Sequence, residues 1–120
     1  MNNHSCDALV VTCMDFRLQD FINDWISTNI PPESYDRVAL GGGVKNLEVI
    51  LGQIEISKRL HDIKKVILIN HQDCGAYGGQ GTPEKHAEDL KEAKEKIKQQ
   101  FPDLAVDTFY LHLDGTFEKV

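Results

Sequence analysis

The chain has 120 residues, of which 41% are hydrophobic and 27% charged, and this predicts one domain, residues 1–120, with a small core. Acidic residues number 19 against 13 Lys and Arg, and the net charge of −6 excludes the dense positive field of a nucleic-acid groove. The apolar stretch 8–11 near the N-terminus is too short for a signal peptide or a membrane span, so we expect a cytoplasmic protein with no membrane partner.

The first two elements predicted from the sequence are a strand and a helix. The β-prone run 8–12 predicts a strand that ends at Cys13. Five apolar residues then recur at helical spacing, which predicts a helix with one buried face: Leu18, Phe21, Ile22, Trp25 and Ile26. Pro31 and Pro32 end this unit.

A second strand is predicted over 35–40 and is followed by three glycines, 41–43. Asn46 is expected to cap a long helix that runs to about His61. This helix has apolar residues on two faces, which indicates burial by a sheet on one side and by a partner subunit on the other. The first face holds Leu47, Ile50, Leu51 and Ile54, and the second holds Val49, Ile56 and Leu60.

The continuous apolar run 66–69 is typical of a central parallel strand, and it ends just before His71. A glycine-rich loop, 75–81, leads to Thr82 and Pro83, which are expected to cap and open a helix that ends near residue 100. The segment 105–113 predicts a fourth strand, followed by a turn at Asp114-Gly115.

Strands and helices alternate along the whole chain, which predicts an α/β fold with a central parallel sheet and helices on both faces. We expect four strands in the order 2-1-3-4. Ligands of such sheets bind beyond the carboxyl ends of the strands, where the strand order reverses. The first and third strands are neighbours at that point, so Cys13 and His71 are expected to meet in one crevice.

Cys13, His71 and Cys74 are the candidate metal ligands, because two thiolates and an imidazole are typical ligands of zinc. Three protein ligands leave a fourth position for water or substrate, as in catalytic zinc sites. The alternatives are that the cysteines are small buried hydrophobic residues or perform thiol redox chemistry, although they form no Cys-x-x-Cys motif. Cys6 is the remaining cysteine, and no role is assigned to it.

Asp15 and Arg17 follow Cys13 closely enough for their side chains to pair and to keep the carboxylate ionised. The alternative is a surface salt bridge of little energetic value. The glycines 41–43 are interpreted as a backbone turn that lets the loop approach the site rather than as a phosphate cradle. The other histidines are interpreted as ordinary surface or core residues: His4, His61, His86 and His112.

The combination Cys13-x-Asp15-x-Arg17 and His71-x-x-Cys74-Gly75 resembles the β-class carbonic anhydrases over most of the chain. The resemblance implies a Zn²⁺ held by the two cysteines and the histidine. It also implies that Asp15 and Arg17 form a catalytic pair, and that a zinc-bound hydroxide converts CO2 to bicarbonate reversibly. Members of that family are dimers or larger homo-oligomers, so a homodimer or higher oligomer is expected here.

The sequence departs from that family in two ways. Twelve residues precede Cys13, so we expect the N-terminal helical arm to be absent. The family's Arg-Asn-Ala-Gly after the second strand is replaced by Ala39-Leu40-Gly41-Gly42-Gly43. Two alternatives therefore stay open: a zinc-binding protein without CO2 hydration activity, in which Asp15 closes the metal site, and a zinc hydrolase of a related substrate such as COS or CS2.

Overall fold

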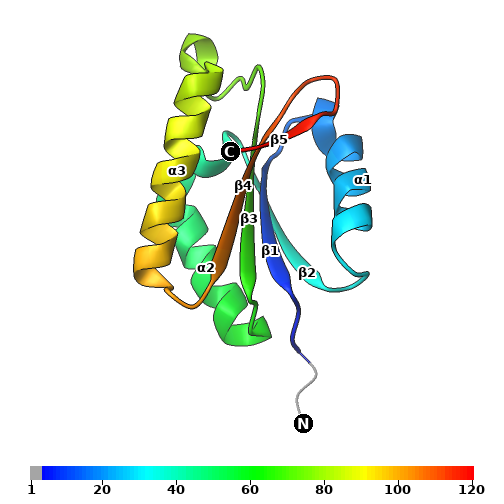
Figure 1. Cartoon of the computed structure of the whole chain (residues 1–120), viewed down its shortest axis with the longest axis vertical. Coiled ribbons are helices and arrows are strands. Elements are labelled where there is room, and N and C mark those ends of the chain that lie inside the picture. The colour runs from blue at the N-terminus through cyan, green and yellow to red at the C-terminus, as the bar shows by residue number, and fades with distance from the viewer. Residues whose placement is uncertain (1–3) are drawn as a thin grey trace.

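In the computed structural model, which describes residues 4–120, five strands form one sheet in the order β2-β1-β3-β4-β5 (Figure 1). The strands are β1 (Ala8–Cys13), β2 (Tyr35–Leu40), β3 (Lys65–His71), β4 (Ala105–Leu111) and β5 (Phe117–Lys119). The helices are α1 (Gln19–Asn29), α2 (Leu47–His61) and α3 (Pro83–Gln100). Short 3-10 turns span Phe16–Leu18, Gly43–Asn46 and Gly78–Gln80. The first four strands in this order are parallel, and β5 is antiparallel to β4.

The central strands are buried on both faces, so their side chains divide between two cores. In β1, Leu9 and Val11 belong to one core while Ala8 and Val10 belong to the other. The same alternation in β3 follows from the period of two along a strand. A shift of register by one residue would exchange the two sets, so the pairing of β1 with β3 is strongly specified.

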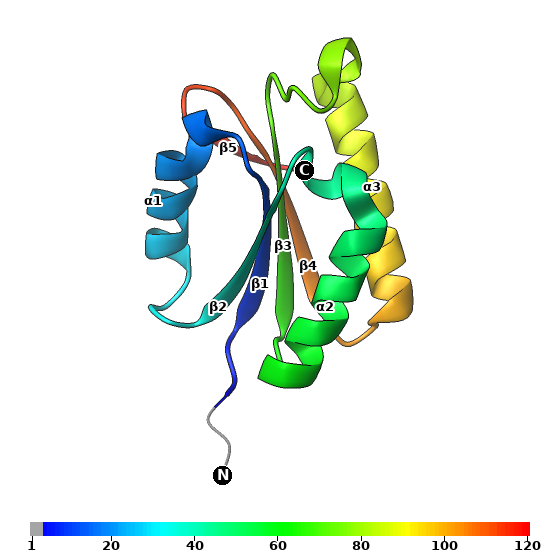
Figure 2. The same cartoon turned by 180° about the vertical axis from the view of Figure 1, so that it is seen from behind.

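The helices cover the two faces unequally. Figure 2 shows α2 and α3 together on one face and α1 alone on the other. The larger core includes Ile50 and Ile54 of α2 with Leu90 and Ile97 of α3. The smaller core uses Ile22 and Ile26 of α1. Within residues 4–120, no helix has the length and apolar content needed to cross a lipid bilayer.

The predicted α/β architecture and the strand order 2-1-3-4 are confirmed, but the sheet has a fifth strand that was not expected. The predicted turn at Asp114-Gly115 is present, and the chain then folds back along β4. Phe117 of this added strand stacks on Trp25, with ring centroids 5.3 Å apart. Packing against α1 therefore fixes a strand that is too short to show a sequence pattern of its own.

The predicted cap of α3 is confirmed, whereas the predicted cap of α2 is not. Thr82 caps α3 as predicted, since its side chain accepts a hydrogen bond from the N–H of Lys85, and Pro83 opens the helix. The prediction for Asn46 is wrong in one respect, because its side chain makes no capping hydrogen bond. A 3-10 turn leads directly into α2 and gives Asn46 φ −102° and ψ 58°, outside the extended backbone region typical of capping residues.

The fourth strand, β4, ends earlier than predicted, at Leu111.

The second apolar face of α2 lies on the surface of the single chain. Val49 is 43% exposed, Ile56 is 39% exposed and Leu60 is 49% exposed. Ile50 and Ile54 of the same helix are completely buried. The helix therefore packs on the sheet with one face and leaves the other uncovered by its own chain.

We predict that Ile54→Ala lowers the free energy of unfolding by about 2–5 kcal/mol, because it creates a cavity in the larger core. Ile56→Ala removes the same atoms from the exposed face of the same helix and should cost less than about 1 kcal/mol in the isolated chain. Urea unfolding followed by circular dichroism at low protein concentration measures both values. Equal and small losses for the two variants would contradict the packing described for α2.

Candidate metal site

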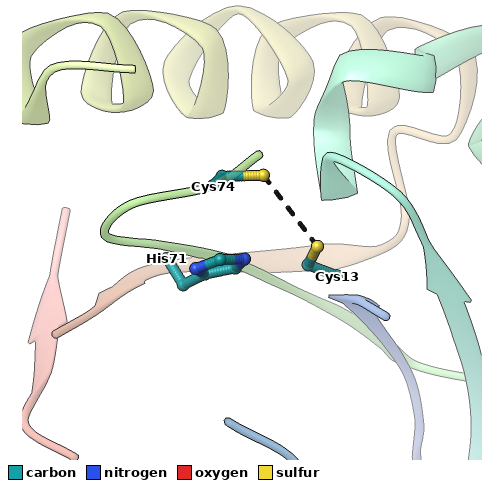
Figure 3. Close-up of side chains that lie close together, drawn as sticks. All are labelled: Cys13, His71 and Cys74. Carbon is teal, nitrogen blue, oxygen red and sulfur yellow. Dashed lines mark hydrogen bonds between the residues drawn. The ribbon is translucent and has the colours of Figure 1, made fainter. Parts of the chain in front are cut away.

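Three predicted ligand side chains meet at the carboxyl edge of the sheet. Cys13 is the last residue of β1, His71 is the last residue of β3, and Cys74 lies in the turn that follows. All three are buried. Their ligand atoms lie within 4.8 Å of one another, and Figure 3 shows the two sulfur atoms turned toward each other with the imidazole ring beside them. The parallel pairing of β1 and β3 thus brings together residues far apart in sequence.

The spacing of the two sulfur atoms fits a shared metal ion. The Sγ atoms of Cys13 and Cys74 are 3.9 Å apart, far longer than the roughly 2.05 Å of a disulfide bond. Two sulfur atoms bound at about 2.3 Å to a tetrahedral zinc ion would lie about 3.8 Å from each other. Both cysteines are free thiols, so the donor set suits zinc in chemistry and in distance.

His71 is held in an orientation that leaves one ring nitrogen available. Its Nδ1 lies 2.7 Å from the backbone carbonyl oxygen of Gln72, to which it donates. Its Nε2 is buried and has no hydrogen-bond partner among residues 4–120. A buried polar atom without a partner is costly in a folded protein. A metal ion would satisfy it, and a second hydrogen bond from the far nitrogen is the usual arrangement for a histidine ligand.

The two thiols have different electrostatic surroundings. Burial raises the pKa of Cys13, but the neighbouring His71 ring and the N–H of Gly42 more than offset this and bring the pKa to about 7. The Gly42 N–H donates to the Cys13 sulfur at 3.4 Å. Burial, together with the neighbouring Cys13, raises the pKa of Cys74. Cys13 is therefore the thiol that ionises first, and a bound cation would favour the thiolate of both.

Asp15 and Arg17 form the predicted pair, and the pair is more extensive than a surface salt bridge. Arg17 Nη2 lies 2.6 Å from Asp15 Oδ2, and Arg17 Nε lies 3.1 Å from Asp15 Oδ1. The backbone N–H of Arg17 donates to the same carboxylate. Hydrogen bonding from Arg17 lowers the pKa of Asp15 to about 2, so the carboxylate is ionised at neutral pH. Its Oδ2 lies 3.9 Å from Nε2 of His71.

Asp73 is a member of this group that the sequence analysis did not assign. Arg17 Nη1 donates to its carboxylate at 3.0 Å and Nη2 donates to its carbonyl oxygen at 2.9 Å. One guanidinium group thereby joins the loop after β1 to the loop after β3. Asp73 has a positive φ of 57°, which aspartate tolerates better than most residues. In the sequence, only its position between His71 and Cys74 indicated that Asp73 could belong to the site.

Two further polar residues hold the loop after β1. Gln19 donates through Nε2 to the carbonyl oxygens of Cys13 and Asp15, at 3.2 and 2.8 Å. Its Oε1 in turn accepts a hydrogen bond from Arg37 of β2 at 2.7 Å. These contacts fix the backbone that carries the cysteine and the carboxylate. Nothing in the local sequence pattern pointed to them, because each contact depends on the fold.

The glycine run after β2 approaches the site closely. Gly42 and Gly43 have positive φ values of 88° and 56°, a conformation that favours glycine. A Cβ atom at Gly43 would lie 2.5 Å from Oδ1 of Asn70. That oxygen accepts a hydrogen bond from the N–H of Val44. The run is thus a tight backbone turn beside the sheet, in agreement with its interpretation from the sequence.

A buried polar network lies behind the candidate ligands. Asn70 Nδ2 is 2.9 Å from Nδ1 of His86 and donates to the Tyr77 hydroxyl at 3.1 Å. Tyr77 donates to Asp89 at 2.8 Å, and its ring packs on His86 with centroids 4.0 Å apart. His86 is fully buried. It lies on the same helical stripe as Leu90, a spacing that could have identified it as a core residue.

Fold and site together define an α/β protein with a Cys-His-Cys cluster at the point where the strand order of a mostly parallel sheet reverses. Comparison with known proteins identifies the family of this chain. Residues 3–120 match the model of the family described as "Putative carbonic anhydrase". The chain belongs to this family.

Two relatives cover nearly the whole chain. An uncharacterized protein of Rickettsia conorii is 34% identical over 98% of this chain and 73% of its own length. An uncharacterized protein of Rickettsia bellii is 32% identical over 98% of this chain and 83% of its own. They confirm that the sequence is one of a group of related proteins.

Three solved structures with the same fold are described as carbonic anhydrases. The β-carbonic anhydrase isoform I of Trichomonas vaginalis matches with a TM-score of 0.72 at 16% identity, over 99% of this chain and 85% of that one. The carbonic anhydrase of Glaciozyma antarctica matches with a TM-score of 0.63 at 20% identity, over 93% and 80%. A tetrameric β-carbonic anhydrase of Sordaria macrospora gives 0.61 at 13% identity, over 98% and 82%. At these identities the likeness shows the fold alone, whereas the family match over residues 3–120 confirms the resemblance found in the sequence.

Burial lowers the pKa of His86 from 6.5 to about 4, which predicts a pH dependence of stability. The unfolded chain binds a proton at this residue near pH 6.5 and the folded chain only near pH 4, so its contribution is complete above pH 6.5 and is lost as the pH falls toward 4. From pH 7.5 to pH 5 the loss should be about 2 kcal/mol. Urea unfolding of the native chain and of His86→Gln at both pH values measures this loss, which the variant should lack. If the free energy of unfolding depends on pH identically in the two proteins, the lowered pKa of His86 is not its source.

Proposed function

We propose that this chain is a zinc-dependent carbonic anhydrase that interconverts CO2 and bicarbonate, with Cys13, His71 and Cys74 as the zinc ligands. The observation that carries the proposal is the convergence of these side chains around the buried Nε2 of His71, which has no hydrogen-bond partner in the described part of the chain. Membership of the carbonic anhydrase family supports the same reaction. The cytoplasm is the compartment we propose, since reduced thiols persist there.

Bound zinc would supply a Lewis acid that makes water acidic enough to react near neutral pH. The protein contributes the surroundings in which CO2 and water combine to give bicarbonate and a proton. The N–H of Gly42 donates to the Cys13 sulfur, which withdraws electron density from a thiolate that would otherwise weaken the Lewis acid. Burial of all three ligand side chains keeps bulk water away from the donor atoms.

Asp15 is proposed to orient the reacting water by accepting its hydrogen bond. Arg17 binds both oxygens of this carboxylate and keeps them ionised. The same contacts hold the carboxylate back from completing a closed four-ligand site, the arrangement expected of a non-catalytic zinc protein. The pairing in the structure thus favours the enzyme over that alternative. Arg17 is in turn held by Asp73, so the positions of the two loops are coupled.

A homodimer or larger assembly is proposed as the working form. The support is the exposed apolar face of α2, formed by Val49, Ile56 and Leu60, and the tetrameric state named for the similar protein of Sordaria macrospora. Burial of such a face against a second copy would remove apolar surface from water. In that case the cost of Ile56→Ala rises with protein concentration, and sedimentation gives a mass above that of one chain.

The metal assignment predicts that His71→Ala and Cys74→Ala each lower the zinc content by about one ion per chain, because a three-ligand site does not survive the loss of a ligand. His112→Ala is the matched control, since this histidine lies elsewhere and pairs with Glu118. Metal analysis of zinc-loaded, dialysed protein gives the stoichiometry. Unchanged zinc in both ligand variants would remove the basis for the proposed enzyme.

The role of the pair predicts that Asp15→Ala and Arg17→Ala keep this zinc but lower kcat/KM for CO2 hydration by about 10- to 100-fold, the usual effect of losing a residue that supports a metal site. Stopped-flow CO2 hydration with a pH indicator measures the rate, and metal analysis of the same samples is the control. Parallel assays on COS and CS2 separate the proposed substrate from related ones. Variants that hydrate CO2 at the native rate would refute the role of the pair.

A further inference from the structure

A second group of metal-binding side chains lies at the opposite end of the sheet. Cys6 precedes β1, Asp36 is the second residue of β2, and His61 is the last residue of α2. Their ligand atoms lie within 4.8 Å of one another, and all three residues are half-buried. Cys6 lies seven positions before Cys13 along a segment that is mostly strand β1, which corresponds to roughly 23 Å. This group is therefore independent of the site proposed for catalysis.

Contacts from three segments hold the group together. The N–H of Cys6 donates to the carbonyl oxygen of His61 at 3.0 Å, which fixes the cysteine beside the end of α2. Asp36 Oδ2 lies 2.6 Å from Nδ1 of His61 and accepts a hydrogen bond from the Ser57 hydroxyl at 2.6 Å. The Ser57 hydroxyl thus orients the carboxylate from outside the group, as supporting residues of metal sites do. The contact between Asp36 and His61 holds two of the donors side by side.

A fourth donor stands at the same pocket. His4 lines it together with Cys6, Asp36 and His61. The His4 ring lies edge-on to the His61 ring, with centroids 6.1 Å apart. Sulfur, carboxylate oxygen and two imidazoles would complete the four ligands that a structural zinc site requires.

The chemistry of the donors selects the kind of ion. A thiolate and imidazoles favour zinc and similar transition metals, whereas magnesium and calcium prefer sites made of oxygen atoms alone. A thiolate and a carboxylate together also balance a divalent charge. In the structure, Asp36 and His61 form an ion pair, a contact that the proposed ion would replace. Cys6 packs at the edge of the larger core, with its thiol 3.8 Å from the carbonyl oxygen of Ala8.

We propose that Cys6, Asp36 and His61, with His4 as the fourth ligand, bind a second zinc-type divalent cation. This ion would tie the segment before β1 to β2 and to the end of α2. Its role is structural, because four protein ligands leave no position for substrate.

The test counts zinc ions on the full chain after loading and exhaustive dialysis. The native protein should hold about two ions, and Cys6→Ser or His61→Ala should reduce this to about one. His112→Ala is the control, because it removes a histidine that also pairs with a carboxylate but has no thiol beside it; it should keep both ions. No loss of zinc in either variant would overturn the proposal, whatever the total bound by the native protein, because that total also depends on the site of Cys13, His71 and Cys74.

Cobalt substitution gives a readout that separates the two sites. The thiolate-to-cobalt absorption of the double variant Cys13→Ser/Cys74→Ser should persist and should vanish when Cys6→Ser is added. If the double variant does not fold, Cys6→Ser in the otherwise native chain should lower this absorption by about one third, since one thiolate of three is lost. An absorption unchanged by Cys6→Ser would show that this thiol binds no metal and would refute the proposal.

Discussion

The parallel pairing of β1 with β3 is the constraint on which the rest of the molecule depends. Both strands are buried on both faces, so the two cores fix their register. The ends of these strands are the places where Cys13 and His71 stand. The geometry of the candidate site is therefore set by the hydrophobic packing of the two strands that lead to it. The polar contacts of the loops refine this geometry but do not create it.

Arg17 links the loops that carry the candidate site. Arg17 lies between the loops that follow β1 and β3, and it binds the carboxylates of Asp15 and Asp73 at once. Because Cys13 stands directly before the first loop and Cys74 lies in the second, this contact ties the relative position of the two cysteines to the ionised state of Asp15. The carboxylate nearest to His71 is thus part of both the structure and the proposed reaction.

Much of the fold could be predicted from the sequence, because its signals are local. Continuous apolar runs marked the central strands, and the Thr82-Pro83 pair marked the start of α3. β5 could not be predicted, since a strand of three residues has no periodicity and depends on the contact of Phe117 with Trp25. Asn46 was misassigned as a cap for a related reason: a 3-10 turn before α2 changes its backbone angles.

Only those residues of the candidate site that lie at the ends of strands could be predicted from the sequence. Cys13 and His71 follow apolar runs, and topology alone places them together. Gln19, Arg37 and Asp73 act through contacts that form only in the folded chain. His86 is an intermediate case. It was interpreted as an ordinary surface or core histidine, although its spacing to Leu90 puts it on the buried stripe of α3.

The two edges of the sheet differ, and this limits how copies of the chain could extend it. One edge is β5, which has three residues and ends in Lys119, two features that discourage strand addition. The other edge is β2, with six residues. Growth of the sheet from copy to copy would thus be possible at one side only. Two chains joined there about a two-fold axis would use up both available strands, so this mode of assembly is self-limiting and cannot propagate into a fibre.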